Sequence, residues 1–301
     1  MGITDDAPSR RRIFRKGIDV CGGMAAAAVL PAIAAGPSTA NETIKTIHSL
    51  RTIHGDFSDR RVPDSDVEAI LDACVRGANA SNMQSYSIIV SRDPVKVRKL
   101  TTYGGNCLFL FCADYNRLLD VAQHLGHEYH ADNIEAFVTS STNTILAAQT
   151  AVIAAKSMGI DSLLTNGIHR GDIERIWTIL DLPQQACFPL IALMLGYPRK
   201  EPDHRTGRLR GPGVIHRETY QHATKDQMAA LVSLHDDPAS NLGLNNAWRA
   251  KGYDHYLDWF YKEWVNGRKA TTSEGQVCRR LKKSGFIDSQ NAQTAPLVKP
   301  S

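Results

Sequence analysis

The chain has 301 residues, 43% of them apolar, so it is long enough to bury one large hydrophobic core or two modest ones. Its formal net charge is +4, but five basic and three acidic residues lie in the first 40, which leaves +2 for the remainder. This near balance argues against a nucleic-acid-binding surface. The six cysteines show neither a CxxC pair nor zinc-ligand spacing, so we predict no disulfide framework and expect most of them to be small buried apolar residues.

Residues 1–40 have the pattern of an export signal. Adjacent arginines at Arg10, Arg11 and Arg12 precede Phe14, and an apolar, alanine-rich run follows over residues 21–35. This run is shorter than the roughly 20 residues that cross a bilayer, so we predict no stable membrane span. The pattern resembles a twin-arginine-type signal peptide and predicts a periplasmic protein that begins near Asn41. The alternative is a cytoplasmic protein with a disordered, basic N-terminus.

Apolar runs and capping residues predict helices and strands in mixed order along the rest of the chain. Asp93 and Asp172 are suited to cap helices, and the continuous apolar run at residues 107–112 indicates a strand buried on both faces. The mixed order predicts an α+β layer fold rather than regular βαβ winding. We predict helices over residues 42–50, 63–74, 94–100, 118–130, 145–160 and 173–180, and strands over 86–90, 107–112, 160–164 and 188–195.

The rest of the chain is organised around the helix predicted over residues 145–160. Apolar residues occupy almost all of its faces, which predicts burial on most sides, and Gly159 is suited to end it with a positive φ. A short strand then leads to Thr165, Asn166 and Gly167, a polar turn that suits backbone N–H groups offered to a flat ligand. The alternative is an ordinary core helix followed by a loop.

Composition divides the predicted mature chain into three parts. Residues 41–225 carry all of the predicted strands and form the main domain. Residues 226–288 are helical and contain an aromatic stripe that would need a core of its own, so we expect an arm that packs on a partner subunit. Residues 289–301 are predicted to be a disordered tail.

Two arginine-bearing loops and one amide-rich loop are candidate binding segments. Arginine forks beside a hydroxyl suit a phosphate, although each such loop read alone is more often a solvated surface loop. The amides can pair with the edge of a heterocycle, or can form an ordinary Asx turn. The candidates are Arg51-Thr52 with His54, Arg208 with Arg210, and Asn82 with Gln84.

Together these features resemble the FMN-dependent nitroreductase family. Arg51-Thr52 is followed about thirty residues later by Ser81-Asn82 and Gln84, and then by the alanine-rich helix with its glycine-bearing turn. Leu182-Pro183 and the Arg208 loop follow in the family's order. The resemblance covers residues 44–220, and the segments 104–106 and 111–117 are most similar to the larger, oxygen-insensitive NADPH-preferring subgroup.

The resemblance implies a fold, a cofactor and a set of binding residues. It implies a three-layer fold with a mostly antiparallel central sheet flanked by helices, and an obligate homodimer that binds FMN at its interface. Arg51, Thr52, His54 and Arg208 would hold the phosphate and ribityl chain, with Arg210 as a further contact. Ser81, Asn82, Gln84 and Asn106 would surround the ring, and backbone N–H groups of Thr165, Asn166 and Gly167 would lie near its reactive edge.

The implied function is an oxidoreductase with a ping-pong cycle. Electrons would pass from NAD(P)H or another donor to a small aromatic acceptor such as a nitroaromatic or a quinone. No protein acid–base pair is required, because the flavin carries the chemistry. The alternatives are a dehalogenase-like flavoprotein and a non-catalytic periplasmic electron carrier, each using a protein donor.

Three histidines form a further candidate site. On the helix predicted over residues 118–130, His124 and His127 would lie close together, with His130 rotated further around, and imidazole binds zinc and copper. We favour the alternative, a polar helix without metal.

Overall fold

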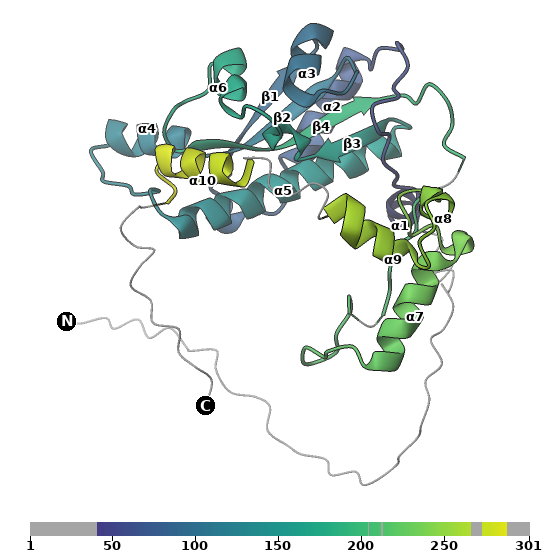
Figure 1. Cartoon of the computed structure of the whole chain (residues 1–301). Helices are drawn as coiled ribbons and strands as arrows, with labels where there is room; N and C mark the ends of the chain where they lie inside the picture. The colour runs from purple at the N-terminus through teal and green to yellow at the C-terminus, as the bar shows by residue number, and fades with distance from the viewer. Residues whose placement is uncertain (1–40, 204, 212, 266–272, 288–301) are drawn as a thin grey trace, which may run out of the picture. The chain divides into compact units, whose positions relative to one another are not determined.

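We describe a computed structural model of the protein, for residues 41–203, 205–211, 213–265 and 273–287 (Figure 1). The signal predicted over residues 1–40 and the tail predicted over residues 289–301 lie outside these described residues. The described residues all belong to one compact unit.

The centre of this unit is a four-stranded antiparallel sheet, as predicted. Its strands are β1 (Tyr86–Ser91), β2 (Leu108–Asp114), β3 (Asp161–Thr165) and β4 (Cys187–Gly196). Their order across the sheet is β1-β2-β4-β3, so β1 and β3 form the two edges. The inner strand β2 is buried on both faces, which explains its unbroken apolar sequence.

The side chains of alternate residues of the inner strands belong to two separate hydrophobic clusters, one on each face of the sheet. Leu108, Leu110 and Cys112 of β2 belong to one cluster, whereas Phe109 and Phe111 belong to the other. The first cluster is covered by α3 (Pro94–Thr101), α6 (Glu174–Leu180) and α10 (Ser273–Lys283), and the second by α2 (Asp64–Cys74) and α5 (Ile134–Ser157). Figure 1 shows the resulting three layers, with α5 on one side of the sheet and α3 and α6 on the other. The predicted α+β layer fold is confirmed.

Helix α5 is longer and less buried than its sequence predicted. It begins at Ile134, eleven residues before the predicted start, where the Asn133 side chain caps it by accepting from the Ala136 N–H. One face is buried in the second cluster, but Val138 and Ile145 are 58% and 46% exposed. Within a single chain, therefore, α5 is buried on one face and not on most sides as predicted. The predicted end is confirmed, because Gly159 takes a φ of +74°.

Helix α4 (Asn116–His124) ends six residues before its predicted end. Gly126 takes a φ of +74°, and the His127 N–H donates to the Ala122 carbonyl, which is the hydrogen bond of a Schellman motif. His127 and His130 therefore lie outside the helix, and the predicted helical grouping of the three histidines is wrong.

The remaining helices agree closely with the predictions in the first part of the chain. Asp93 and Asp172 accept from backbone N–H groups at the starts of α3 and α6, as expected for capping residues. The other elements are α1 (Glu42–His48), η1 (Ala80–Asn82), η2 (Gly167–His169), α7 (Lys225–Asp236), η3 (Pro238–Ser240), α8 (Ala247–Ala250), α9 (Tyr256–Trp259) and the π-helical turn η4 (Phe260–Val265).

The segment predicted as an arm, residues 226–288, is divided in the structure. Trp248, Tyr256 and Trp259 form a third, small cluster within the same chain, so the aromatic stripe has a core of its own. Helix α10, by contrast, packs on the first cluster through Leu281, and Phe286, just after the helix, belongs to the same cluster. Across the described residues, no helix combines the length and the apolar character that a membrane crossing requires.

Candidate functional site

Arg51 lies in a short segment that runs beside the edge strand β3. Thr52 forms a single parallel bridge with Ser162, and the Ile53 N–H donates to the Ser162 carbonyl over 2.9 Å. This pairing brings Arg51 to Asp161, the first residue of β3. Arg51 Nε and Nη2 donate to the Asp161 carboxylate over 3.1 and 2.6 Å. A buried carboxylate therefore fixes the first predicted phosphate-binding residue in place.

A second carboxylate covers the outer side of the Arg51 guanidinium. Glu201, whose side chain is 74% exposed, accepts from Arg51 Nη1 over 2.6 Å and from Nη2 over 3.3 Å. This bidentate pair has the geometry by which arginine also binds phosphate. The outer side of Arg51 therefore accommodates an anionic group that approaches from solvent.

The charges around Asp161 stabilise one another. Lys156, near the end of α5, also donates to Asp161 over 2.6 Å. Burial by itself would raise the pKa of Asp161, but the hydrogen bonds from Arg51 and Lys156 outweigh burial and hold that pKa below its usual value. The hydrogen bonds to Asp161 and then Glu201 raise the pKa of Arg51. The cluster therefore remains charged at neutral pH.

The amide-rich loop before β1 has an unusual backbone. Ser81, Asn82 and Gln84 all take positive φ values, of 50°, 54° and 47°. Non-glycine residues adopt this left-handed region at a cost, which asparagine tolerates best. The Gln84 side chain donates to the Tyr86 hydroxyl over 3.3 Å, which holds this amide near the start of β1.

Polar contacts hold the same loop against α4 and α5. Asn143 of α5 accepts from the Ala80 N–H over 2.9 Å and donates to Ser85 Oγ over 2.8 Å. Arg117 of α4 donates to the Gln84 carbonyl over 2.8 Å. These bonds offset the cost of the left-handed residues, so the loop is preorganised rather than loosely attached.

The predicted turn after β3 satisfies part of its own backbone. Thr165 Oγ1 accepts from the Gly167 N–H over 3.0 Å, and Gly167 is buried. In this conformation one of the three backbone donors predicted for the ligand is therefore used inside the turn. Asn166 is exposed at its tip.

These three groups lie at defined places on the sheet. The register pairs Asp161 with Gly196 and Thr165 with Ala192, so Arg51 and the turn are separated by the length of β3, roughly 13 Å. The loop before β1 lies at the opposite edge of the sheet, and three strand spacings, roughly 14 Å, separate β1 from β3. A single chain thus aligns Arg51 and the turn along one edge and carries Ser81–Gln84 at the other.

The remaining predicted residues are placed less uniformly. Thr52 and His54 are exposed beside Arg51. Asn106 Nδ2 lies 3.5 Å from the carbonyl oxygens of Asp59 and Arg60, a few residues further along the chain from His54. Arg208 and Arg210 are exposed, and Arg208 donates to carbonyls of its own loop.

Two residues near Arg51 were not predicted. Arg205 donates to the His48 carbonyl, and Glu201 pairs with Arg51. Both lie shortly before Arg208 in the chain, but Arg205 and not Arg208 reaches the segment before Arg51.

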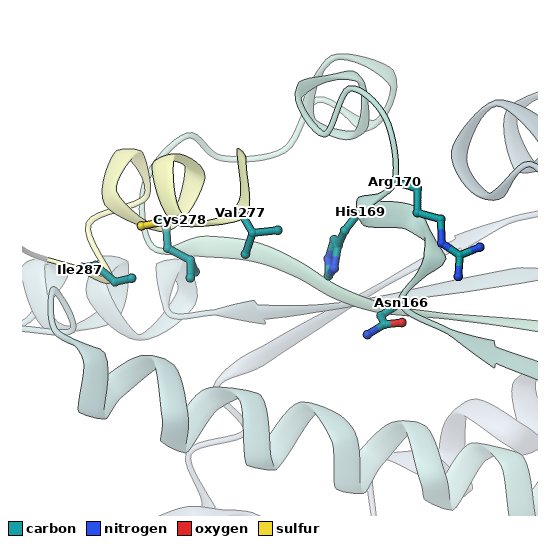
Figure 2. Close-up of a pocket in the computed structure, with 7 residues that line it drawn as sticks. Asn166, His169, Arg170, Val277, Cys278 and Ile287 are labelled. Atoms are coloured by element: carbon teal, nitrogen blue, oxygen red, sulfur yellow. The ribbon is translucent and has the colours of Figure 1, made fainter. Parts of the chain in front are cut away.

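A cavity of about 480 Å³ opens next to the turn after β3. Figure 2 shows the lining side chains, which come from η2 and the residues on either side of it, and from α10 and the segment after it. Asn166 and Arg170 lie toward one end, Val277, Cys278 and Ile287 toward the other, and His169 between them. The lining residues are Asn166, His169, Arg170, Val277, Cys278, Leu281 and Ile287.

The cysteines and histidines of the described chain form neither a disulfide nor a metal site. Cys74, Cys107, Cys112 and Cys187 are buried free thiols, as expected, and Cys278 is exposed. No cluster of three or more His, Cys, Asp or Glu residues with metal-binding geometry occurs among the residues described.

Comparison with known proteins decides the family. The oxygen-insensitive NADPH nitroreductase of Salmonella typhimurium is 30% identical to this chain over 187 residues, which are 60% of this chain and 75% of the relative. The chain belongs to the nitroreductase family. The FMN reductase (NADPH) of Bacillus subtilis is 28% identical over 252 residues, covering 80% of this chain and 92% of the relative. No family model matches the chain.

Solved structures of nitroreductase relatives agree with the fold described above. NfrA2 of B. megaterium superposes with a TM-score of 0.70 at 26% identity, over 82% of this chain and 98% of that chain. The NfrA1 nitroreductase of B. subtilis gives a TM-score of 0.69 at 26% identity, over 81% and 98% of the two chains. The mixed arrangement of helices and antiparallel strands is thus that of nitroreductase-family proteins.

Proposed function

We propose that this chain is an FMN-dependent oxidoreductase that transfers electrons from NAD(P)H to small aromatic acceptors such as nitroaromatics and quinones. The observation that carries the proposal is the edge of β3, which has an anion-binding arginine at one end and an exposed amide turn at the other. The names of the relatives, an FMN reductase and an NADPH nitroreductase, support the same function.

The residues at this edge fit the parts of FMN. Arg51 already holds the Glu201 carboxylate in a bidentate pair, so the FMN phosphate is suited to take that place, with Thr52, His54 and Arg205 nearby. Asn166 would lie toward the ring. When bound, FMN supplies the redox chemistry by accepting and donating a hydride equivalent.

The chain's own residues orient the ligands and hold the charges in place. Asp161 keeps Arg51 aimed along the edge of β3, and Thr165 fixes the turn through the Gly167 N–H. The left-handed loop at Ser81–Gln84 presents amide groups from a preorganised backbone. The donor and the acceptor are expected to use the same face in turn, which gives ping-pong kinetics.

We also propose that the functional unit is a homodimer with the ring site at its interface. Within one chain, Ser81–Gln84 and the turn after β3 lie at opposite edges of the sheet, so a ring contacted by both needs a second copy. Helix α5 exposes an apolar stripe that would be buried in such a dimer. The stripe consists of Ile134 (54% exposed), Val138 (58%), Ile145 (46%) and Leu146 (40%).

An anaerobic absorbance spectrum of the purified, FMN-reconstituted protein tests the function. We expect a flavin spectrum that bleaches on addition of NADPH and returns on addition of nitrofurazone or menadione. Initial rates with both substrates varied should give parallel double-reciprocal lines. Failure to retain FMN would contradict the proposal, and a retained spectrum that no pyridine nucleotide bleaches would assign the chain to a protein electron donor instead.

Export remains a proposal that rests on the sequence pattern of residues 1–40. We propose that these residues direct the folded protein to the periplasm through a twin-arginine-type route. Cell fractionation should find the wild-type chain outside the cytoplasm, and replacing Arg11 and Arg12 together by lysine should retain it inside. Recovery of both forms inside the cytoplasm would contradict export, and recovery of both outside it would contradict the twin-arginine-type route.

A further inference from the structure

The cavity between η2 and α10 has an apolar wall that is firmly built. Val277 and Leu281 come from α10 and Ile287 from the segment after it, and all three pack against the first hydrophobic cluster. Leu281 is only 7% exposed. Because α10 is anchored to the core of the same chain, this wall is preformed, and its aliphatic side chains suit the face of a flat ring.

The other end of the cavity carries a guanidinium with no partner in the described chain. No ion pair or side-chain hydrogen bond involves Arg170 among the residues described, and this residue is exposed. The neighbouring Arg175 differs, because it donates to the carbonyls of Leu100 and Ile168 over 3.0 Å each. Arg170 therefore remains available for an anionic ligand, whereas Arg175 is part of the framework.

His169 adds a polar group to the cavity without adding charge. Its Nε2 lies 2.8 Å from the Pro189 carbonyl oxygen, which can only accept, so Nε2 carries the proton. Burial lowers the pKa of His169, which keeps the ring neutral at pH 7 and leaves Nδ1 as an acceptor. No carboxylate lines the cavity, so the positive charge of Arg170 makes the lining cationic.

We infer that this cavity binds flat aromatic molecules that bear one anionic group, and that such anionic aromatics are the preferred acceptors of the proposed reductase. The ring would lie against Val277, Leu281 and Ile287, and the carboxylate-type group would pair with Arg170. The role of these molecules as electron acceptors rests on the proposed function. The link is Asn166, which belongs both to the cavity and to the turn assigned to the flavin. The binding step can be tested without any turnover.

Cys278 supplies a reporter inside the cavity. It lines the cavity and is exposed, whereas the other four described cysteines are buried. We would measure the rate at which N-ethylmaleimide alkylates Cys278 in the full-length, FMN-reconstituted protein, by mass spectrometry of the peptide that carries it. The ligands are 2-naphthoate, its neutral analogue 2-naphthamide, and NADP⁺.

Naphthoate should protect Cys278 at about tenfold lower concentration than naphthamide, the ratio expected for one charge-assisted hydrogen-bonded pair. Arg170→Gln should abolish this ratio, and Arg170→Lys should retain part of it. Arg76→Gln removes an equivalent exposed charge from the end of α2 and should leave the ratio unchanged. In turnover, Arg170→Gln should lower kcat/KM about tenfold for 4-nitrobenzoate and leave it unchanged for 4-nitrobenzamide.

The outcomes separate this inference from the proposed function. Equal protection by naphthoate and naphthamide would overturn the inference even if NADPH reduces the bound flavin normally. Protection by NADP⁺ alone would assign the cavity to the electron donor and also overturn it. Charge-selective protection in a protein that fails to retain FMN would uphold the binding site but refute its role as an acceptor site, together with the proposed function.

Discussion

The guanidinium of Arg280 lies 3.7 Å from the centre of the Trp177 ring, and its side chain is fully buried between α10 and α6. The same group donates to Gln184 Oε1 over 3.0 Å and pairs with Glu174 over 3.3 Å. Burial lowers the pKa of Arg280, but arginine stays charged at any ordinary pH. This single side chain therefore joins the C-terminal helix, and with it the apolar wall of the cavity, to the core.

Replacing Arg280 by alanine should destabilise the protein by about 2–4 kcal/mol. The change removes the stacking on Trp177 and leaves Gln184 without its partner. Chemical denaturation measures the free energy of unfolding. Arg279→Ala, on the exposed side of the same helix, should change it by less than about 0.5 kcal/mol. Equal effects of the two changes would show that α10 is not anchored through Arg280.

The ion cluster at the start of β3 should make stability fall at acidic pH. The pKa of Asp161 is lowered in the folded chain, so its contribution is fully present above the unfolded value of about 3.9 and is lost as pH falls through the lower folded value. Arg51→Ala removes one of its two cationic partners and should cost about 2 kcal/mol at pH 7.

Denaturation curves at pH 7 and pH 3 measure this dependence. The difference between wild type and Arg51→Ala should shrink at the lower pH, because the unfolded chain then binds a proton at Asp161 that the wild-type fold, with its lowered pKa, disfavours. Arg76→Ala, which removes an exposed arginine outside the cluster, should leave both curves unchanged. A difference that stays constant between the two pH values would show that Arg51 does not lower the pKa of Asp161.

The sheet was predictable because its signals are local. Each strand is a short apolar run, and the two faces of β2 follow from the alternation of its own residues. The start of α5 was missed for the opposite reason. Ser140, Asn143 and Thr144 are polar, which argues for a position before the helix, yet all three are buried within it. Their partners are supplied mainly by Ser85, which is 55 residues away in the case of Ser140.

The candidate site was predictable in its residue types but not in its pairing. Arg51 was chosen for phosphate binding, but its two carboxylate partners lie 110 and 150 residues further along the chain. No local pattern marks Asp161 or Glu201 as its neighbours. The strand order likewise cannot be read from the sequence, although it alone places Ser81–Gln84 and Asn166 at opposite edges of the sheet.

The C-terminal aromatic cluster should loosen as pH rises above neutrality. His255 Nδ1 contacts Asp236 Oδ2 over 2.7 Å, and Asp236 also accepts from the Tyr256 N–H over 2.7 Å. The hydrogen bond to Asp236, with the nearby charges of Asp258 and Asp254, raises the pKa of His255. The stabilisation is fully present below the unfolded value of about 6.5 and is lost as pH rises through the higher folded value.

Hydrogen exchange of α9 amides between pH 6 and pH 8.5, corrected for the intrinsic exchange rate, measures this loosening. Protection should fall with pH in the wild type and should be lower and independent of pH in His255→Gln. His130→Gln, which changes an exposed histidine before α5, should behave as the wild type. Unaltered pH dependence in His255→Gln would assign the effect to another group.

The apolar stripe on α5 should control both assembly and cofactor binding. Val138→Glu places a charge in the proposed interface and should convert a dimer into a monomer, with FMN affinity lowered about tenfold or more because the ring site loses its second chain. Sedimentation velocity and fluorescence titration measure the two effects. Val95→Glu makes the same change at an exposed valine of α3 and should alter neither. A monomeric wild-type protein that binds FMN tightly would refute the interface.

Glu201 should compete with the FMN phosphate for Arg51. Its carboxylate occupies the outer side of the guanidinium, so a phosphate must displace it, whereas the buried Asp161 can stay in place. Glu201→Gln should therefore raise FMN affinity by up to about fivefold at low ionic strength, with a smaller gain in 0.5 M salt. Titration of the apoprotein, followed by flavin fluorescence, gives the dissociation constant without any turnover.

Riboflavin lacks the phosphate and provides the matched ligand. Its affinity should be the same for wild type and Glu201→Gln, because the competition exists only for the anion. Glu68→Gln, an exposed change on α2, should leave the affinities for both flavins unchanged. An equal gain for FMN and riboflavin would mean that Glu201 acts on the ring or on the loop as a whole. Arg51 would then bind Glu201 only as a structural ion pair, and the phosphate would have to bind elsewhere, for example at Arg205.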